Sequence, residues 1–383
     1  MTRPLRVMTV FGTRPDTIKM APVVHALAAR RPAIEPLVCV TAQHRKMLDD
    51  LLTLFAIEPD FDLDIMRPDQ TLTGITTRVL EGMEGVLERA EPDVVLVHGD
   101  TSTSTAAALA AFYRRIPVGH VEAGLRTSTP SAPFPEEMNR RLTGRIAAYH
   151  FSPTRIAREN LLRENVAPAD VFVTGNTVID AFLETASRRF EAPAAEWSGL
   201  DASRPLIFVT AHRRENHDHM PEICRALIEI AGLPARPQIL WPVHPSPRVA
   251  GVALAMLDGV AGIKLVEPMA YDATVRSVRR ATLVLTDSGG LQEEAPCLGK
   301  PVLVMRNETE RPEGIEAGTL ELVGSDRAAI VGATRRLLED EVAYARMAHA
   351  SNPYGDGKAA RRIVDWLLAR LRDGVAPDEF RAA

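Results

Sequence analysis

The sequence predicts an α/β protein with two doubly wound, Rossmann-like domains in tandem. The chain has 383 residues, which is more than one hydrophobic core usually supports. Short apolar runs alternate with segments of helical periodicity in both halves, and polar residues follow the runs where they end. A stretch rich in Ala, Pro and Ser, residues 190–205, reads as a linker between the halves.

The first half contains repeated strand–turn–helix units. Leu5–Phe11 is an apolar run, and Asp16–Arg30 has helical periodicity behind Pro15, which suits a first helical turn. Further strands are expected at 37–41, 94–97, 118–121 and 171–174, and a further helix at 73–89. Helical crossovers between successive strands predict a parallel sheet.

The second half repeats this pattern. Strands are expected at 206–210, 238–242, 263–266 and 281–286, and the tail from Asp326 is helical except for a turn at 352–357. We expect an N-terminal domain at 1–175, a second domain at 176–365, and a helix end and tail at 366–383. Two such sheets in tandem predict a ligand-binding cleft between the domains.

Composition excludes several classes of partner. With 45 Lys+Arg against 50 Asp+Glu the formal net charge is −5, which gives no reason to expect nucleic acid or an anionic membrane. No apolar run is long enough to span a membrane, and the N-terminus does not resemble a signal peptide. The 3 cysteines are far apart without metal-ligand spacing, so we expect a cytoplasmic protein without a bound metal.

Three carboxylates stand out in the first half. Asp100, Glu122 and Glu136 each lie where a predicted strand ends or a helix is about to begin. Parallel strands can bring such groups to one edge of a sheet, which is the usual ligand crevice. An isolated acid in this position is more often a helix cap, so the carboxylates alone do not establish catalysis.

The second half offers an anion site. Asp287-Ser288-Gly289-Gly290 follows a predicted strand at a helix entrance, where glycines let the backbone approach a phosphate and the helix dipole favours negative charge. Glu294, further along that helix, suits the hydroxyls of a ribose. A plain glycine turn is the alternative.

Basic residues lie near both expected sheet edges. Arg14 and Lys19 adjoin the first helix, where they could bind an anion or could equally be solvated surface cations. Arg213 and Arg311 could contact phosphate in the second half. His212 and His244 each follow a strand, where proton transfer or phosphate binding competes with a purely structural role. No Walker loop and no G-x-G-x-x-G is present, which argues against ATP hydrolysis and a standard dinucleotide cofactor.

Long segments of the chain resemble one enzyme family in order, from about Arg6 to about Ala369. They are FGTRPDTIKMAPV, HGDTSTST, GHVEAGLRT, PFPEEMNRR, VTGNTVIDA, TAHRREN, PVHPSP, LTDSGGLQEEAPCLGKPVLVMR, TERPEG and NPYGDG. The family is that of the bacterial non-hydrolysing UDP-N-acetylglucosamine 2-epimerases. The resemblance implies interconversion of UDP-N-acetylglucosamine and UDP-N-acetylmannosamine without cofactor or metal. It also implies a glycosyltransferase-B-like pair of Rossmann-like domains facing a cleft, and a homodimer whose C-terminal helix packs back on the first domain.

The resemblance also implies roles for individual residues. Asp100, Glu122 and Glu136 would move protons on the two faces of the sugar, and His212 would offset charge on the departing UDP. The implied UDP-binding residues are Arg14, Lys19, Arg213, Ser288, Gly289, Gly290, Glu294 and Arg311. A second, activating UDP-N-acetylglucosamine would contact Gln43, His44, Gln70 and His244.

This chain departs from the family pattern in places. Lys46 and Asp69 differ near the activating site, and Met269, Asp272 and Thr274 differ near the expected uracil position. The rival enzymes are a hydrolysing epimerase that releases N-acetylmannosamine and UDP, a paralogue for another UDP-sugar, and a glycosyltransferase of the same fold. A UDP-sugar-binding regulator without activity is the non-enzymatic alternative, although the three acids are retained.

Overall fold

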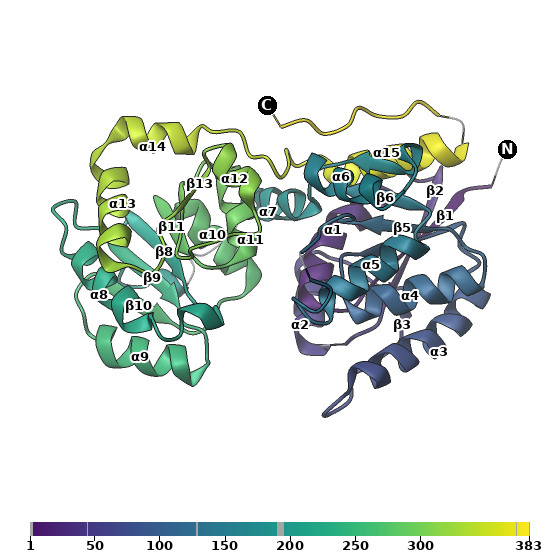
Figure 1. Ribbon diagram of the computed structural model, residues 1–383. Coiled ribbons are helices and arrows are strands. Elements are labelled where there is room, and N and C mark those ends of the chain that lie inside the picture. Colours follow the sequence, from purple (N-terminus) through teal and green to yellow (C-terminus); the bar gives the residue numbers. More distant parts are fainter. Residues whose placement is uncertain (1–2, 44, 128, 190–194, 373, 383) are drawn as a thin grey trace. The chain divides into compact units, whose positions relative to one another are not determined.

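The computed structural model describes residues 3–43, 45–127, 129–189, 195–372 and 374–382. Contacts within the chain divide it into two compact units, drawn in Figure 1. The first unit contains the residues up to Ala181 together with Tyr354–Arg381, and the second is built from Phe182–Pro353. His44, one of the predicted ligand-binding residues, lies outside the described residues.

The first unit is a seven-stranded parallel sheet in the order β3-β2-β1-β4-β5-β6-β7. Its strands are β1 (Leu5–Phe11), β2 (Ile34–Val40), β3 (Phe61–Asp62), β4 (Val94–His98), β5 (Val118–Val121), β6 (Tyr149–Ser152) and β7 (Val171–Val173). Its helices are α1 (Arg14–Ala28), α2 (Arg45–Leu54), α3 (Leu72–Ala90), α4 (Ser102–Tyr113), α5 (Glu136–Ile146), α6 (Arg155–Arg163) and α15 (Ala359–Arg372), with a short 3-10 helix at Pro168–Asp170.

The second unit is a six-stranded parallel sheet in the order β10-β9-β8-β11-β12-β13. Its strands are β8 (Leu206–Thr210), β9 (Gln238–Pro242), β10 (Ile263–Val266), β11 (Leu283–Thr286), β12 (Val302–Val304) and β13 (Leu320–Leu322). Its helices are α8 (Met220–Ala231), α9 (Pro247–Leu257), α10 (Tyr271–Arg280), α11 (Gly289–Glu294), α12 (Pro312–Glu316), α13 (Arg327–Glu339) and α14 (Glu341–Ala348), with 3-10 helices at Ala195–Trp197, Arg214–Asn216 and Ala295–Leu298.

Both sheets are doubly wound, which confirms the predicted fold class. In each unit the strand order reverses direction at the pair formed by the first strand and a later one, β1 with β4 and β8 with β11. Such a reversal leaves a crevice at the carboxyl ends of the two strands. The sheets are held by apolar side chains that are fully buried, such as Met83 under the first sheet and Trp241 in the second.

The C-terminal helix belongs to the first unit. Trp366 of α15 packs edge-on against the rings of Tyr149 and Phe151, with centroid separations of 5.2 and 5.4 Å. The Asp180 carboxylate accepts hydrogen bonds from the amides of Ala359 and Ala360, which satisfies the start of α15. These contacts explain why the whole helix groups with the first sheet.

The unit boundaries differ from those expected at 175/176 and 365/366. They fall at 181/182, within helix α7 (Thr177–Ser187), and at 353/354. The Asn176 amide donates to the Tyr354 carbonyl at 2.7 Å, so the chain on either side of the second unit is joined within the first. A sequence pattern cannot reveal this pairing, because the two residues are far apart in the chain.

Some elements also differ in extent from the prediction. Helix α1 begins at Arg14 rather than Asp16, because Thr13 and Asp16 form a capping box at its start. The short strands β3, β6, β12 and β13 were not predicted. Within the described residues, no helix combines the length and the apolar character needed to cross a membrane.

Candidate active site

Two of the predicted carboxylates lie at the carboxyl edge of the first sheet. Asp100 follows β4 and Glu122 follows β5, and these strands are neighbours in parallel register, with His98 opposite Val121. Strand β4 also borders β1, so this edge is the crevice where the strand order reverses. The sheet thus delivers both acids to the place where a ligand is expected.

Glu122 is buried and surrounded by polar groups. Its Oε1 atom forms an ion pair with Lys19 Nζ and accepts a hydrogen bond from Asn176 Nδ2 at 3.0 Å. Its Oε2 atom lies 3.4 Å from His98 Nε2. The backbone of Glu122 has φ +63, a left-handed conformation that is uncommon for a residue with a side chain. A strained backbone held by several contacts is typical of functional positions.

The charge state of this cluster follows from its surroundings. Burial alone would raise the pKa of the Glu122 carboxyl, but Lys19, His98 and the bond from Asn176 outweigh it and hold the pKa well below its usual range. Burial lowers the pKa of His98 to about 4. At neutral pH the cluster therefore contains an ionised carboxylate beside a neutral imidazole.

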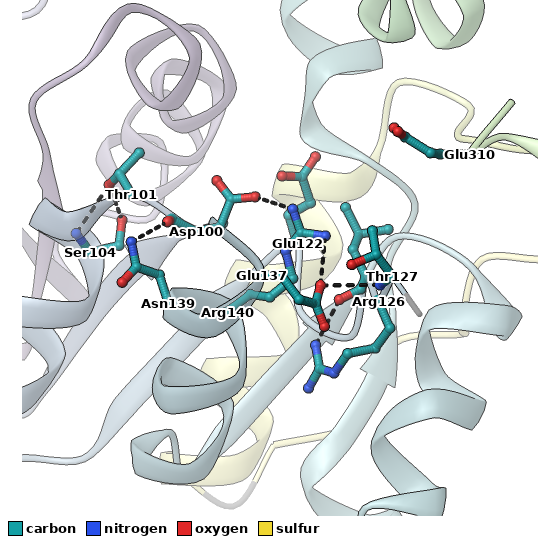
Figure 2. Close-up of polar contacts among 12 residues, drawn as sticks. Asp100, Thr101, Ser104, Glu122, Arg126, Thr127, Glu137, Asn139, Arg140 and Glu310 are labelled. Atoms are coloured by element: carbon teal, nitrogen blue, oxygen red, sulfur yellow. Dashed lines mark hydrogen bonds and ion pairs between the residues drawn. The ribbon is translucent and has the colours of Figure 1, made fainter. Parts of the chain in front are cut away.

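Asp100 is connected to helix α5 through an arginine. Arg140 Nη2 contacts Asp100 Oδ2 at 2.5 Å, and Arg140 Nη1 lies 3.3 Å from Glu137 Oε2 (Figure 2). Asn139 Nδ2 donates to the Asp100 carbonyl at 2.9 Å, which fixes the backbone as well. About a quarter of the Asp100 side chain is exposed, at 27%, so it can meet a ligand.

Glu137 is the buried acid of α5. Its carboxylate accepts from Arg141 Nε at 2.6 Å and from the Thr127 amide at 3.1 Å, and the side chain is fully buried. The neighbouring Glu136 begins α5 and is partly exposed. Among the described residues no hydrogen bond or ion pair links Glu136 to Asp100 or Glu122, and its catalytic role stays a prediction.

The basic residues of α1 differ in their surroundings. Arg14 is exposed at the first position of the helix, where an anion could reach it. Lys19 is partly buried, and its ammonium group is engaged by Glu122. The contact of these two residues with UDP stays a prediction.

The predicted activating site is only partly described. Gln70 Nε2 donates to the Gln43 carbonyl at 3.2 Å, and Gln43 Oε1 accepts from Thr103 Oγ1 at 3.0 Å. Gln70 Oε1 in turn accepts from Arg78 Nη2 at 2.9 Å. The two glutamines are therefore neighbours in the first unit, while the binding of a second UDP-sugar there stays a prediction.

In the second unit two guanidinium groups converge on Gly289, the first residue of α11. A Cβ atom added to Gly289 would lie 3.3 Å from Arg311 Cζ and 3.5 Å from Arg213 Nη2. Arg311 is held by the buried Glu293, with Nη2 at 2.8 Å from its carboxylate. Backbone amides and two cations at one turn form a site suited to a phosphate group.

The remaining residues of this turn are placed as follows. Ser288 is the residue before α11, and its amide donates to Thr286 Oγ1 at 2.9 Å. Glu294 is the last residue of α11, but its side chain reaches back toward the glycine turn at the start of the helix. A Cβ atom on Gly290 would lie 3.6 Å from Glu294 Oε2. The predicted role of Glu294 as a ribose ligand is compatible with partial exposure and stays a prediction.

His212 lies at the second crevice, between β8 and β11. The buried Asp287 carboxylate lies 3.3 Å from His212 Nδ1, and the His212 ring stacks on His244 with a centroid separation of 5.7 Å. Burial lowers the pKa of His212, and the nearby Arg213 and His244 lower it further. Asp287 raises this pKa but does not outweigh the other effects, so the pKa of His212 is lowered overall. The ring is therefore neutral at neutral pH.

Several residues with evident roles in these clusters were not among those predicted. Asp287 was noted only as the start of a glycine turn, although a carboxylate after a buried strand was a usable signal. The spacing of Glu137 to Arg140 and Arg141 marks it as the paired acid of α5. His98 and Asn176 gave no such signal, because their contacts with Glu122 depend on the sheet. No cluster of three metal-ligating side chains is found among the described residues.

Comparison with known proteins identifies the family. A profile of the family described as UDP-N-acetylglucosamine 2-epimerase matches residues 26–368. The UDP-N-acetylglucosamine 2-epimerase of Escherichia coli K12 is 54% identical over 370 residues, covering 95% of this chain and 98% of that protein.

Solved structures agree with this result. The UDP-GlcNAc 2-epimerase of Neisseria meningitidis, bound to UDP-GlcNAc, is 45% identical with a TM-score of 0.85, covering 95% of this chain and 100% of its own. Another UDP-N-acetylglucosamine 2-epimerase structure is 47% identical with a TM-score of 0.92, covering 100% of both chains. The chain therefore belongs to the UDP-N-acetylglucosamine 2-epimerase family.

Proposed function

We propose that this protein interconverts UDP-N-acetylglucosamine and UDP-N-acetylmannosamine without hydrolysing either. In the forward direction the C2–H bond and the bond from C1 to the diphosphate oxygen break, and a C1–C2 double bond forms. The proton goes to a base on the enzyme and the electron pair of the C1–O bond leaves with UDP. Re-addition of UDP at C1, with protonation of C2 from the opposite face, gives the epimer.

The first unit supplies the groups for proton transfer. The C2 proton is not acidic in the ground state, so its removal must accompany positive charge at C1 as the bond to the diphosphate stretches. An ionised Glu122 and the ion-paired Asp100, on neighbouring strands, can stabilise that charge and exchange protons. Two acids on separate strand ends suit a reaction that moves protons on two faces of one ring.

The second unit supplies the site for the leaving group. Gly289 at the entrance of α11, flanked by Arg311 and Arg213, can bind the diphosphate and stabilise its growing charge. The observation that carries the proposal is that a chain of this family has an ionised carboxylate cluster at the crevice of one sheet and an anion site at the crevice of the other. No residue in this scheme requires a metal or a redox cofactor.

Incubation with UDP-N-acetylglucosamine in heavy water tests the proposal. Proton NMR should show UDP-N-acetylmannosamine appearing while deuterium enters C2 of both UDP-sugars, because the removed proton exchanges before the glucal is protonated. The sum of the two UDP-sugars should stay constant. A Glu122→Gln variant provides the blank, since it lacks the proposed proton-transfer carboxylate.

Other outcomes would identify a rival. Accumulation of free N-acetylmannosamine and UDP would show the hydrolysing reaction instead. Conversion of a different UDP-sugar with none of UDP-N-acetylglucosamine would show a paralogue with another substrate. Turnover that needs an added acceptor would point to glycosyl transfer, and any of these three results would overturn the proposal.

A further inference from the structure

Asp287 is a fully buried carboxylate whose two oxygens differ. Oδ2 accepts hydrogen bonds from the amides of His212 and Arg213, both at 2.8 Å, and from Asn216 Nδ2 at 3.0 Å. Asn216 Nδ2 also donates to the Met305 carbonyl at 2.9 Å, which anchors the amide between two strand ends. One oxygen is thus saturated by donors of the protein itself.

The other oxygen has one neighbour that can satisfy it. Oδ1 is buried and makes no hydrogen bond of ideal geometry within the described residues, and His212 Nδ1 lies 3.3 Å away. A buried oxygen without a donor is costly, so the stable arrangement places the imidazole proton on Nδ1. The backbone amide of the same histidine donates a hydrogen bond to Oδ2, so the carboxylate contacts both the main chain and the ring of His212.

The stacked histidine has the opposite arrangement. The Ser246 amide donates to His244 Nδ1 at 3.1 Å, so Nδ1 of the neutral His244 ring carries the lone pair and Nε2 carries the proton. The two rings are nearly parallel, with an interplanar angle of 18°. Side by side they present an Nε2 lone pair from His212 and an Nε2–H donor from His244.

We propose that Asp287 is a positioning residue of the epimerase, which holds His212 in the Nδ1–H tautomer so that Nε2 is free to take up a proton facing the substrate diphosphate. This inference rests on the proposed function for the site of the diphosphate. The tautomer of His212 can be measured without any substrate and without turnover. Asp287 itself does not touch the substrate.

Protonation at Nε2 then has a defined electrostatic setting. A proton from solvent binds the Nε2 lone pair, Nδ1 keeps its own proton, and the resulting imidazolium lies against the negative Asp287. Arg213 and His244, the other charged or titratable groups facing the ring, oppose this charge and lower the pKa of His212 in the free protein. A bound diphosphate supplies negative charge on the exposed side and favours the imidazolium, which can then balance the charge on departing UDP.

The tautomer is measured directly in the wild-type protein. Long-range ¹H–¹⁵N NMR of ¹⁵N-histidine-labelled enzyme at pH 8, with the His212 signals assigned by their loss in His212→Gln, should show Nδ1 protonated and Nε2 unprotonated. His244 should show the reverse and acts as an internal reference. A His212 ring with its proton on Nε2 would overturn the proposal. The measurement needs no folded Asp287 variant and no activity.

The functional consequence is measured with Asp287→Asn. The amide oxygen can still accept from the three donors, while the amide NH₂ faces Nδ1 and favours the wrong tautomer. We expect kcat to fall about 10²–10⁴-fold with a smaller change in KM, as for a misoriented catalytic histidine. The limb of the pH profile that reports protonated His212 should move to lower pH, since the neighbouring negative charge is gone.

The matched control is Asp180→Asn. Asp180 is also a buried carboxylate that accepts hydrogen bonds from two backbone amides, but it caps α15, and no hydrogen bond or ion pair joins it to a histidine among the described residues. The Asp180→Asn variant should keep the wild-type kcat and pH profile. If Asp287→Asn also kept the wild-type tautomer and pH profile, or lost activity with the pH profile unmoved, Asp287 would be only structural. If the wild-type enzyme lacked epimerase activity, the proposed function would fail, and the NMR result would still decide the tautomer.

Discussion

At the scale of single residues, the first crevice is organised by Glu122. Three polar groups from different parts of the first unit determine its charge: Lys19 and His98 come from α1 and β4, and Asn176 precedes α7. An ionised carboxylate in a buried site is stable only with such partners. Its charge is thereby available at neutral pH, beside a neutral imidazole that can accept or pass on a proton.

Replacing either crevice acid by its amide should abolish turnover. For Glu122→Gln and Asp100→Asn we expect kcat to fall about 10²–10⁴-fold, because an amide can neither take up a proton nor stabilise positive charge at C1. Circular dichroism should show a folded protein in both cases. Glu159→Gln, which removes an exposed carboxylate of α6, is the control and should keep full activity. Wild-type turnover in either crevice variant would rule out that acid as a catalyst.

A second residue-scale prediction concerns the anion site. Arg213→Ala should raise the KM for UDP-N-acetylglucosamine about 10–100-fold, because hydrogen bonds to charged groups contribute about 1.5–3 kcal/mol. Steady-state kinetics measures this. Arg327→Ala is the control, since Arg327 pairs with Glu229 on the exposed surface of the same unit and should leave KM unchanged. An unchanged KM for Arg213→Ala would remove it from the binding site.

At the scale of elements, the start of α1 combines stability with pH dependence. The Asp16 carboxylate accepts from the Thr13 amide at 2.6 Å and from Gly12 and the Thr13 hydroxyl, so it caps the helix that carries Arg14 and Lys19. Burial raises its pKa from 3.8 to about 6, although these hydrogen bonds oppose the shift. The loop after β1 is therefore linked to protonation.

The sign of this linkage gives a prediction. Because the folded-state pKa lies above the unfolded one, the folded protein binds more protons between about pH 4 and 6, and stability falls as pH rises through that window. Asp16→Asn should remove this dependence. The difference in unfolding free energy, wild type minus variant, should decrease by about 2 kcal/mol from pH 4 to pH 7. Paired urea titrations at several pH values measure it, and a pH-independent difference would contradict it.

At the scale of the whole molecule, each unit places its candidate residues at the reversal point of its own sheet. Asp100 lies at the crevice of β1 and β4, and His212 at that of β8 and β11. Under the proposed function, the residues for chemistry on the sugar and those for binding the diphosphate come from separate sheets. The cleft predicted from the sequence remains a prediction.

We also expect the protein to be a homodimer. Phe112 and Tyr113 at the end of α4 are 58% and 70% exposed, and adjacent exposed aromatic rings favour burial against a partner. Sedimentation equilibrium should give the mass of two chains, in both the presence and the absence of UDP-N-acetylglucosamine. A single-chain mass at micromolar concentration would show that these rings are not covered by self-association.

Much of this protein follows from its sequence alone. Alternation of apolar runs and helical segments is a local property, so it predicted two doubly wound units and placed strands such as Leu5–Phe11 and Leu206–Thr210 at their observed bounds. The same logic placed Asp100, Glu122 and His212 after strands, because polar residues that end a buried strand must lie at a sheet edge. Long motifs identified the family for the same reason, since they are contiguous in the chain.

The tertiary structure alone decided which groups touch. Lys19 and His98 meet Glu122, and Asp287 meets His212, only because parallel strands bring distant segments to one edge. Ion pairs and pKa shifts depend on distances of a few ångströms and on burial, neither of which is encoded in local periodicity. For the same reason the sequence could predict where the acids lie, while the fold was needed to show that Glu122 is held ionised and that Asp287 lies beside the ring of His212.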